Sequence, residues 1–86
     1  MKAALITVVE HKEVVPANGK TFTMEELQSH VRGYFELVSI PLNPQLLMVV
    51  NEDGHSEGLL PNQCATNLAQ QRIVGPVLVC DRRMIE

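Results

Sequence analysis

The segment of residues 33–62 constrains the fold of this 86-residue chain more than any other. It contains two apolar runs, residues 34–40 and 46–50, each of a length typical of a strand. Prolines separate the two runs, and proline keeps the residue before it out of the helical conformation. The polar residues 51–54 then predict a tight turn in which Gly54 adopts a positive φ. We therefore expect two consecutive strands, the second of them apolar on both faces as in the interior of a sheet.

The clearest helical signal lies just before this segment, over residues 24–32. Thr23 and Glu26 have the spacing of a capping box, in which each side chain bonds the backbone N–H of the other residue. An apolar stripe with helical spacing follows, formed by Met24, Leu27 and Val31. Gly33 is placed to end the helix in the left-handed conformation. We expect this helix to bury the stripe against the sheet.

The rest of the chain supplies the other elements of one α+β domain, residues 1–86, because a second domain would have too few residues for its own core. We expect a strand over residues 3–9, a short edge strand near 14–15, a return strand over 55–58, a helix over 62–70, a strand over 73–80 with a bulge or an edge position near its start, and a frayed tail over 81–86. The order is β-β-α-β-β-α-β. It predicts a small mixed sheet with one main helix on one face and a short second helix, a layout like that of β-grasp proteins.

Composition restricts the partners of such a domain. The net charge is −3, with an isoelectric point near 5.5 and scattered basic residues, which disfavours binding to nucleic acid or to an anionic membrane. No apolar run approaches the roughly 20 residues of a membrane span, and the first residues resemble a strand rather than a signal peptide. Two cysteines are too few for a disulfide framework, so we expect free thiols in a reducing cytoplasm.

Catalytic and metal-binding motifs are absent from the sequence. The acidic turn around Glu52, Asp53 and His55 gathers possible ligands, but Val49 and Leu60 stand where a calcium-binding EF-hand loop needs oxygen donors. Cys64 has no base adjacent to it in sequence, and the serines lack the glycine elbow of hydrolases. The glycine patterns that cradle phosphates are missing as well. We therefore expect no enzymatic activity, no cofactor and no metal.

Four polar side chains lie within or at the ends of predicted elements, and two interpretations of them stay open. They are Tyr34, Asn51, Asn62 and Arg72. In the structural interpretation, Asn51 starts a turn, Asn62 caps the short helix, Tyr34 is a half-buried strand residue and Arg72 is a surface charge. In the functional interpretation all four converge on a pocket, where the amides recognise a base, the ring stacks on it and the guanidinium binds a phosphate.

Four segments of the chain resemble a known family: GYFELVSI, LLMVVNEDG, GLLPNQCATNLA and IVGPVLVC. Together they make residues 24–80 similar to the domain of unknown function DUF3846, which occurs mainly in phages, plasmids and conjugative elements. The resemblance implies an accessory protein made inside a bacterium by a mobile genetic element. It implies no enzymatic activity that could be transferred to this chain.

These observations lead to one main hypothesis and two alternatives. The main hypothesis is a cytoplasmic, non-enzymatic homo-oligomer that sequesters a small nucleotide-type ligand, such as a bacterial immune signal. Self-association is expected because a domain of this size buries modest apolar area on its own. The first alternative is a protein–protein interaction module that inhibits a host protein through a strand edge or an acidic surface. The second is a hydrolase that acts on the same signals.

Overall fold

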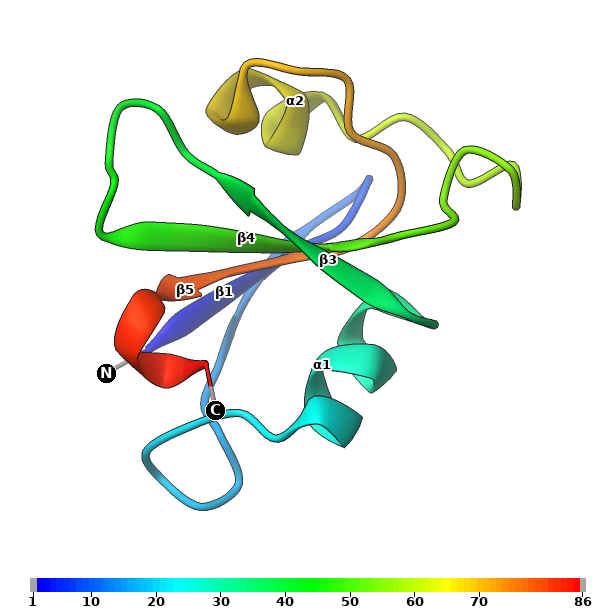
Figure 1. Ribbon diagram of the computed structural model, residues 1–86. Coiled ribbons are helices and arrows are strands. Elements are labelled where there is room, and N and C mark those ends of the chain that lie inside the picture. Colours follow the sequence, from blue (N-terminus) through cyan, green and yellow to red (C-terminus); the bar gives the residue numbers. More distant parts are fainter. Residues whose placement is uncertain (1, 86) are drawn as a thin grey trace.

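Five strands form one sheet with a helix on each face in the computed structural model, which describes residues 2–85 (Figure 1). In chain order the elements are β1 (Ala3–Ile6), β2 (His11–Val14), α1 (Met24–Val31), β3 (Phe35–Ser39), β4 (Leu46–Asn51), α2 (Gln63–Ala69), β5 (Val77–Asp81) and the 3₁₀ turn η1 (Arg82–Met84). The strand order across the sheet is β2-β1-β5-β4-β3. The predicted α+β class and element order are thereby confirmed.

The sheet is antiparallel in each of its strand pairs rather than mixed as predicted. The connection through α2 explains the difference. The segments that enter and leave α2 are bonded to each other, with the Asn62 N–H donating to the Ile73 carbonyl at 2.9 Å. The chain therefore returns to the sheet at the end where β4 left it. As a result β5 runs antiparallel to β4 and to β1, between which it lies.

The alternation of side chains along the strands builds one apolar core on each face of the sheet. Phe22, Leu27, Val31, Val49, Leu78, Cys80 and Met84 are among the buried residues on the α1 face. Ile6, Met48, Val50, Ala65, Ala69, Ile73 and Val77 are among those on the α2 face. Because β4 contributes to both cores, the prediction of an interior strand apolar on both faces is confirmed.

The predicted capping box starts α1. The Glu26 N–H donates to Thr23 Oγ1 at 3.2 Å, and the Thr23 N–H donates to Glu26 Oε1 at 2.9 Å. The backbone N–H groups of Thr23 and Ala17 lower the pKa of Glu26 because they stabilise its carboxylate. The left-handed residue at the end of the helix is Arg32, with φ of 65°, one position before the predicted Gly33.

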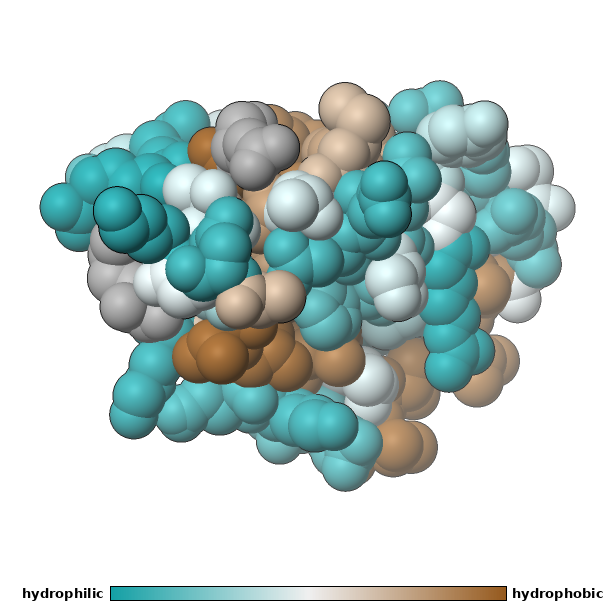
Figure 2. Space-filling view, turned by 90° about the horizontal axis from the view of Figure 1, so that it is seen from below, coloured by the Kyte–Doolittle hydropathy of each residue, from teal (hydrophilic) through white to brown (hydrophobic). Residues whose placement is uncertain are grey.

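The predicted stripe on α1 is wrong at Met24. Leu27 and Val31 are buried as expected, but Met24, the first residue of the helix, is 63% exposed. Seen from the side of α1, the surface is mostly hydrophilic and its hydrophobic side chains form separate patches (Figure 2). The helix therefore packs through its middle and its last turn.

Residues 81–85 form ordered structure, whereas the sequence predicted a frayed tail over 81–86, of which Glu86 lies outside the described residues. Asp81 Oδ1 accepts a hydrogen bond from the Arg83 N–H at 2.8 Å and starts the turn η1. Hydrogen bonds from the Arg83 side chain and backbone hold the pKa of Asp81 well below its ordinary value. This turn places Met84 fully inside the α1 core, where its carbonyl accepts from the Phe22 N–H at 2.7 Å.

Four other local predictions differ from the structure. Residues 7–10 form a turn stabilised by Thr7 Oγ1, which accepts from the Glu10 N–H at 3.0 Å, so β1 is shorter than expected. Residues 55–58 form turns and no strand. Gly54 has no positive φ; it is needed because a Cβ there would lie 2.8 Å from Val74 Cγ2. The Gly-Pro pair at 75–76 precedes β5, which is the central strand and not an edge.

The two cysteines are free, and their surroundings predict different reactivities. Burial raises the pKa of the Cys80 thiol to about 11, and its side chain is 1% exposed. Cys64 is half-buried on α2. We expect a thiol reagent at pH 8 to label one cysteine per native chain, Cys64, and both after denaturation. Labelling of Cys80 at the same rate as Cys64, read from the masses of the peptides, would contradict this assignment.

Candidate functional site

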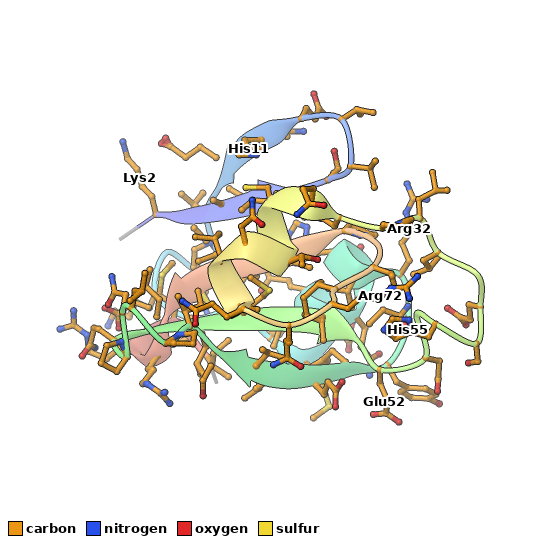
Figure 3. The ribbon with its side chains drawn as sticks, turned by 90° about the horizontal axis from the view of Figure 1, so that it is seen from above. Lys2, His11, Arg32, Glu52, His55 and Arg72 are labelled. Atoms are coloured by element: carbon orange, nitrogen blue, oxygen red, sulfur yellow. The ribbon has the colours of Figure 1, made fainter. Side chains whose placement is uncertain are left out.

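A cleft of about 250 Å³ lies on the α2 face of the sheet, between β3, the end of β4 and the two connections that flank α2. The strands contribute Glu36, Val38, Val50 and Asn51; the connections contribute Glu52, His55, Gln71, Arg72, Ile73 and Val74. Viewed from above, Arg72 and His55 lie close together at one end of the sheet, with Glu52 near them (Figure 3). The floor is apolar and the rim carries both signs of charge.

Arg72 and Gln71 reach the cleft because α2 ends abruptly. Gln70 takes the left-handed conformation, with φ of 56°, and its N–H donates to the Thr66 carbonyl. Beyond it, the Ile73 N–H donates to Thr66 Oγ1 at 2.9 Å, and this hydroxyl donates to the Ile73 carbonyl at 3.2 Å. The short connection is therefore fixed at both ends, which restricts where the two polar side chains can lie.

Asn51 forms part of the opposite wall and is 6% exposed. Its Nδ2 donates to the Val31 carbonyl at 3.0 Å and to Glu57 Oε1 at 3.2 Å, while its Oδ1 accepts from the Asp53 N–H at 2.7 Å. These bonds join the end of α1, the end of β4 and the turn that follows. Both groups of the Asn51 amide are thus engaged in holding the wall of the cleft together.

The rim of the cleft combines hydrogen-bond acceptors with a cation. Glu36 and Glu52 supply carboxylates, Arg72 supplies a guanidinium, and His55 and Gln71 can each donate and accept hydrogen bonds. A guanidinium binds a phosphate or carboxylate through paired N–H groups, whereas carboxylates accept from the amino groups of a ligand. Such a rim suits a small ligand that has an anionic end and an amino-bearing end.

Of the four residues predicted from the sequence, Asn51 and Arg72 line this cleft, but the amide of Asn51 is directed to the end of α1 and is already hydrogen-bonded there. Tyr34 is 69% exposed and is not among the residues that line it. Asn62 is buried at the start of α2, where its Nδ2 donates to the carbonyls of Ile6 and Gly75 at 3.0 and 2.9 Å. The predicted convergence of all four is therefore wrong, because Asn62 holds β1, α2 and the approach to β5 together.

Sequence reasoning missed His55, Gln71, Glu36 and Glu52 as neighbours of Arg72. Glu52 belongs to the predicted tight turn and His55 follows it directly, and nothing local in the sequence places this segment opposite the end of α2. Glu36 did carry a signal, since it is a charged residue on the same face of a strand as Val38 and Ile40. A carboxylate among apolar side chains on one strand face indicates that the core does not cover this part of the face and that solvent reaches it.

The comparison with family models finds a match to the domain of unknown function DUF3846 over residues 1–84. The chain belongs to the DUF3846 family. No curated protein matches this DUF3846 chain, and no solved structure matches it. Its cleft must therefore be interpreted from its own residues.

Two further observations bear on the chemistry of this DUF3846 protein. Among residues 2–85, no three His, Cys, Asp or Glu side chains are grouped so that they could hold a metal ion. No helix within the described part of the chain is long and apolar enough to cross a membrane.

Proposed function

We propose that this DUF3846 protein is a self-associating binding protein that holds a small nucleotide-type ligand in the cleft and releases it unchanged. The observation that carries the proposal is the placement of Arg72 opposite acidic side chains in one small concavity. A nucleotide has the matching polarity, with a phosphate at one end and a base at the other.

The orientation of the ligand follows from the charges of the rim. The phosphate binds Arg72, since Glu36 and Glu52 would repel it. The base then lies toward β3 and β4, where Val38 and Val50 contact its ring and the carboxylates accept from its exocyclic amino group. A volume of about 250 Å³ is below the roughly 300–1,000 Å³ of drug-sized pockets, so one cleft accommodates about one nucleotide.

Binding without turnover is favoured by the residues of the cleft. Those that line it include no serine, threonine, cysteine or lysine nucleophile, and no three His, Cys, Asp or Glu side chains among the described residues are grouped to hold a metal ion that could activate water. Of the two thiols, Cys80 belongs to the core on the opposite face of the sheet, and Cys64 is not among the lining residues. The resemblance to proteins of phages and other mobile elements suggests the setting: sequestration of a nucleotide immune signal in the cytoplasm of a bacterial host.

Calorimetric titration with AMP, ADP-ribose and cyclic di-AMP tests this function. Arg72→Ala should weaken the binding of a phosphate-bearing probe about 10- to 100-fold, because a charge-assisted hydrogen bond contributes roughly 1.5–3 kcal/mol. Lys12→Ala, which removes the same charge from β2 at the far edge of the sheet, is the control and should leave affinity unchanged. The probe should be recovered intact after denaturation. No binding by the folded protein, or breakdown of the probe, would contradict the proposal.

Inhibition of a host protein remains the second candidate, and a different surface favours it. An apolar groove of about 240 Å³ is lined by Val8, Val9, Leu59, Leu60, Pro76 and others. Val9 is 90% exposed and Leu60 is 66% exposed, which is unusual for large aliphatic side chains. Capture from host lysate separates the candidates: an inhibitor retains a polypeptide that Val9→Asp releases, whereas a sequestering protein retains a small molecule that Arg72→Ala releases.

A further inference from the structure

Strand β3 lies at the edge of the sheet, in front of β4 in Figure 1, and presents unpaired backbone groups. The Glu52 N–H donates to the Tyr34 carbonyl at 2.9 Å, which sets the alternation of the hydrogen bonds between β3 and β4. Glu36 and Val38 therefore bond to β4. The N–H and C=O groups of the alternate residues, Phe35, Leu37 and Ser39, point away from the sheet, and no described residue bonds to them.

The opposite edge, β2, has the features that protect an exposed strand. It has four residues, it carries Lys12 and Glu13, and Pro16 follows it closely. By contrast β3 has five residues and one charge, and Leu37 at its centre is 46% exposed. An unprotected edge of this kind pairs readily with another strand.

We propose that two copies of this chain pair through β3, antiparallel, about a two-fold axis at Leu37. In this register Leu37 lies opposite the partner's Leu37, and Phe35 lies opposite the partner's Ser39. All the outward N–H and C=O groups of β3 are then bonded, and the two sheets become one continuous sheet. A register centred on Glu36 is disfavoured, because it places that carboxylate directly opposite the partner's Glu36.

The pairing joins the two clefts, and this part of the inference rests on the proposed function. Glu36 and Val38 line the cleft from the edge strand itself. In the pair, the partner's Glu36 lies opposite Val38 at a strand spacing of roughly 4.8 Å, so each cleft gains a wall from the other copy. An antiparallel pair of this symmetry places both clefts on the same face of the joined sheet.

The joined site selects a class of ligand. It presents two Arg72 guanidinium groups and two apolar floors related by a two-fold axis. In the orientation proposed above, each phosphate lies at Arg72 and each base lies toward β3, so the two phosphates are held on the far sides of the joined site. Two mononucleotides fit this arrangement, one per chain, with each base beside the partner's Glu36. A cyclic dinucleotide does not fit it, because its two phosphates belong to one small central ring.

Disulfide cross-linking tests the register. Opposed residues of a hydrogen-bonded antiparallel pair have Cα atoms roughly 5.5 Å apart, within the range of a disulfide. In a Cys64→Ala background, where the remaining Cys80 is 1% exposed, Leu37→Cys should form a covalent dimer on mild oxidation. Ser39→Cys, on the same strand and face, is the control, because the Ser39 positions of the two copies lie roughly 13 Å apart in this register. Equal cross-linking of both variants, or none at Leu37→Cys, would overturn the proposed pairing.

The mass in solution and the binding of two probes separate this inference from the proposed function. By light scattering, the wild type should have twice the 9.6 kDa mass of the chain, whereas Leu37→Lys should be a folded monomer. This variant should bind AMP about tenfold more weakly, because each cleft loses the hydrogen-bond acceptor that the partner's Glu36 supplies, while Val15→Lys, beside the other edge, should match the wild type. Cyclic di-AMP should bind more weakly than AMP to the wild-type dimer. A monomeric wild type that binds AMP overturns the pairing and leaves the proposed function standing. A dimer that does not bind AMP keeps the pairing and overturns the shared site together with the proposed function.

Discussion

Asn62→Ala should lower the free energy of unfolding by roughly 3–4 kcal/mol, a large fraction of the stability of a domain this small. The Asn62 side chain is 1% exposed and makes three hydrogen bonds. Its Nδ2 satisfies the buried carbonyls of Ile6 and Gly75, and its Oδ1 caps α2 through the Ala65 N–H at 3.1 Å. Alanine leaves the two carbonyls and the N–H without these partners. Urea unfolding followed by circular dichroism measures the difference.

Asn67→Ala is the matched control for this prediction. Asn67 lies on the same helix, is exposed and accepts a bond from the Gln63 side chain at 2.9 Å. We expect its replacement to change the free energy of unfolding by about 0.5 kcal/mol or less. Similar effects of the two substitutions would show that Asn62 contributes no more than an ordinary surface amide, against the structural role assigned to it.

Met84→Ala should destabilise the protein by about 2–5 kcal/mol, the usual cost of deleting a buried methionine side chain. Met84 is fully buried among Phe22, Leu27 and their neighbours, so alanine leaves a cavity in the α1 core. The backbone bond from the Phe22 N–H to the Met84 carbonyl remains available in the variant. Thermal and urea unfolding of the variant measure the effect of the side chain alone.

Met24→Ala supplies the control for Met84, because sequence and structure disagree about Met24. Its helical spacing predicted a core residue, but the side chain is 63% exposed. We expect the substitution to change stability by about 0.5 kcal/mol or less. A larger loss at Met24 than at Met84 would contradict the packing described for both ends of the chain.

The elements that the sequence predicts well are those with local causes. Helix α1 depends on a capping box within four residues, and β4 on a run of consecutive apolar side chains, so both could be read without knowledge of the rest of the fold. The C-terminal turn has no such local cause. Met84 is ordered because it meets Phe22, which is distant in sequence, and no pattern within residues 81–86 indicates that contact.

The residues of the candidate site show the same difference between local and tertiary causes. Asn51 and Arg72 could be selected because each follows an apolar or helical segment, where chain ends gather polar groups. That His55 faces Arg72 depends on how the two connections of α2 lie against each other. Asn62 was selected for the same reason as Asn51, and the interpretation of it as a cap was the correct one. Asn51 also has the structural role, because its amide starts the turn and is bonded to Val31, Asp53 and Glu57. Polar residues at the ends of elements therefore gave four candidates, of which the tertiary structure leaves Arg72 with its side chain available to a ligand in the cleft.

Backbone amide NMR during titration with AMP tests most directly whether the cleft is the binding site. We predict that the largest shift changes occur at Val38, Asn51, His55, Arg72 and Ile73, from the strands and connections that line it. They should saturate together and disappear in Arg72→Ala. Shift changes that instead centre on Val9 and Leu60, or a spectrum that AMP leaves unchanged, would contradict the account.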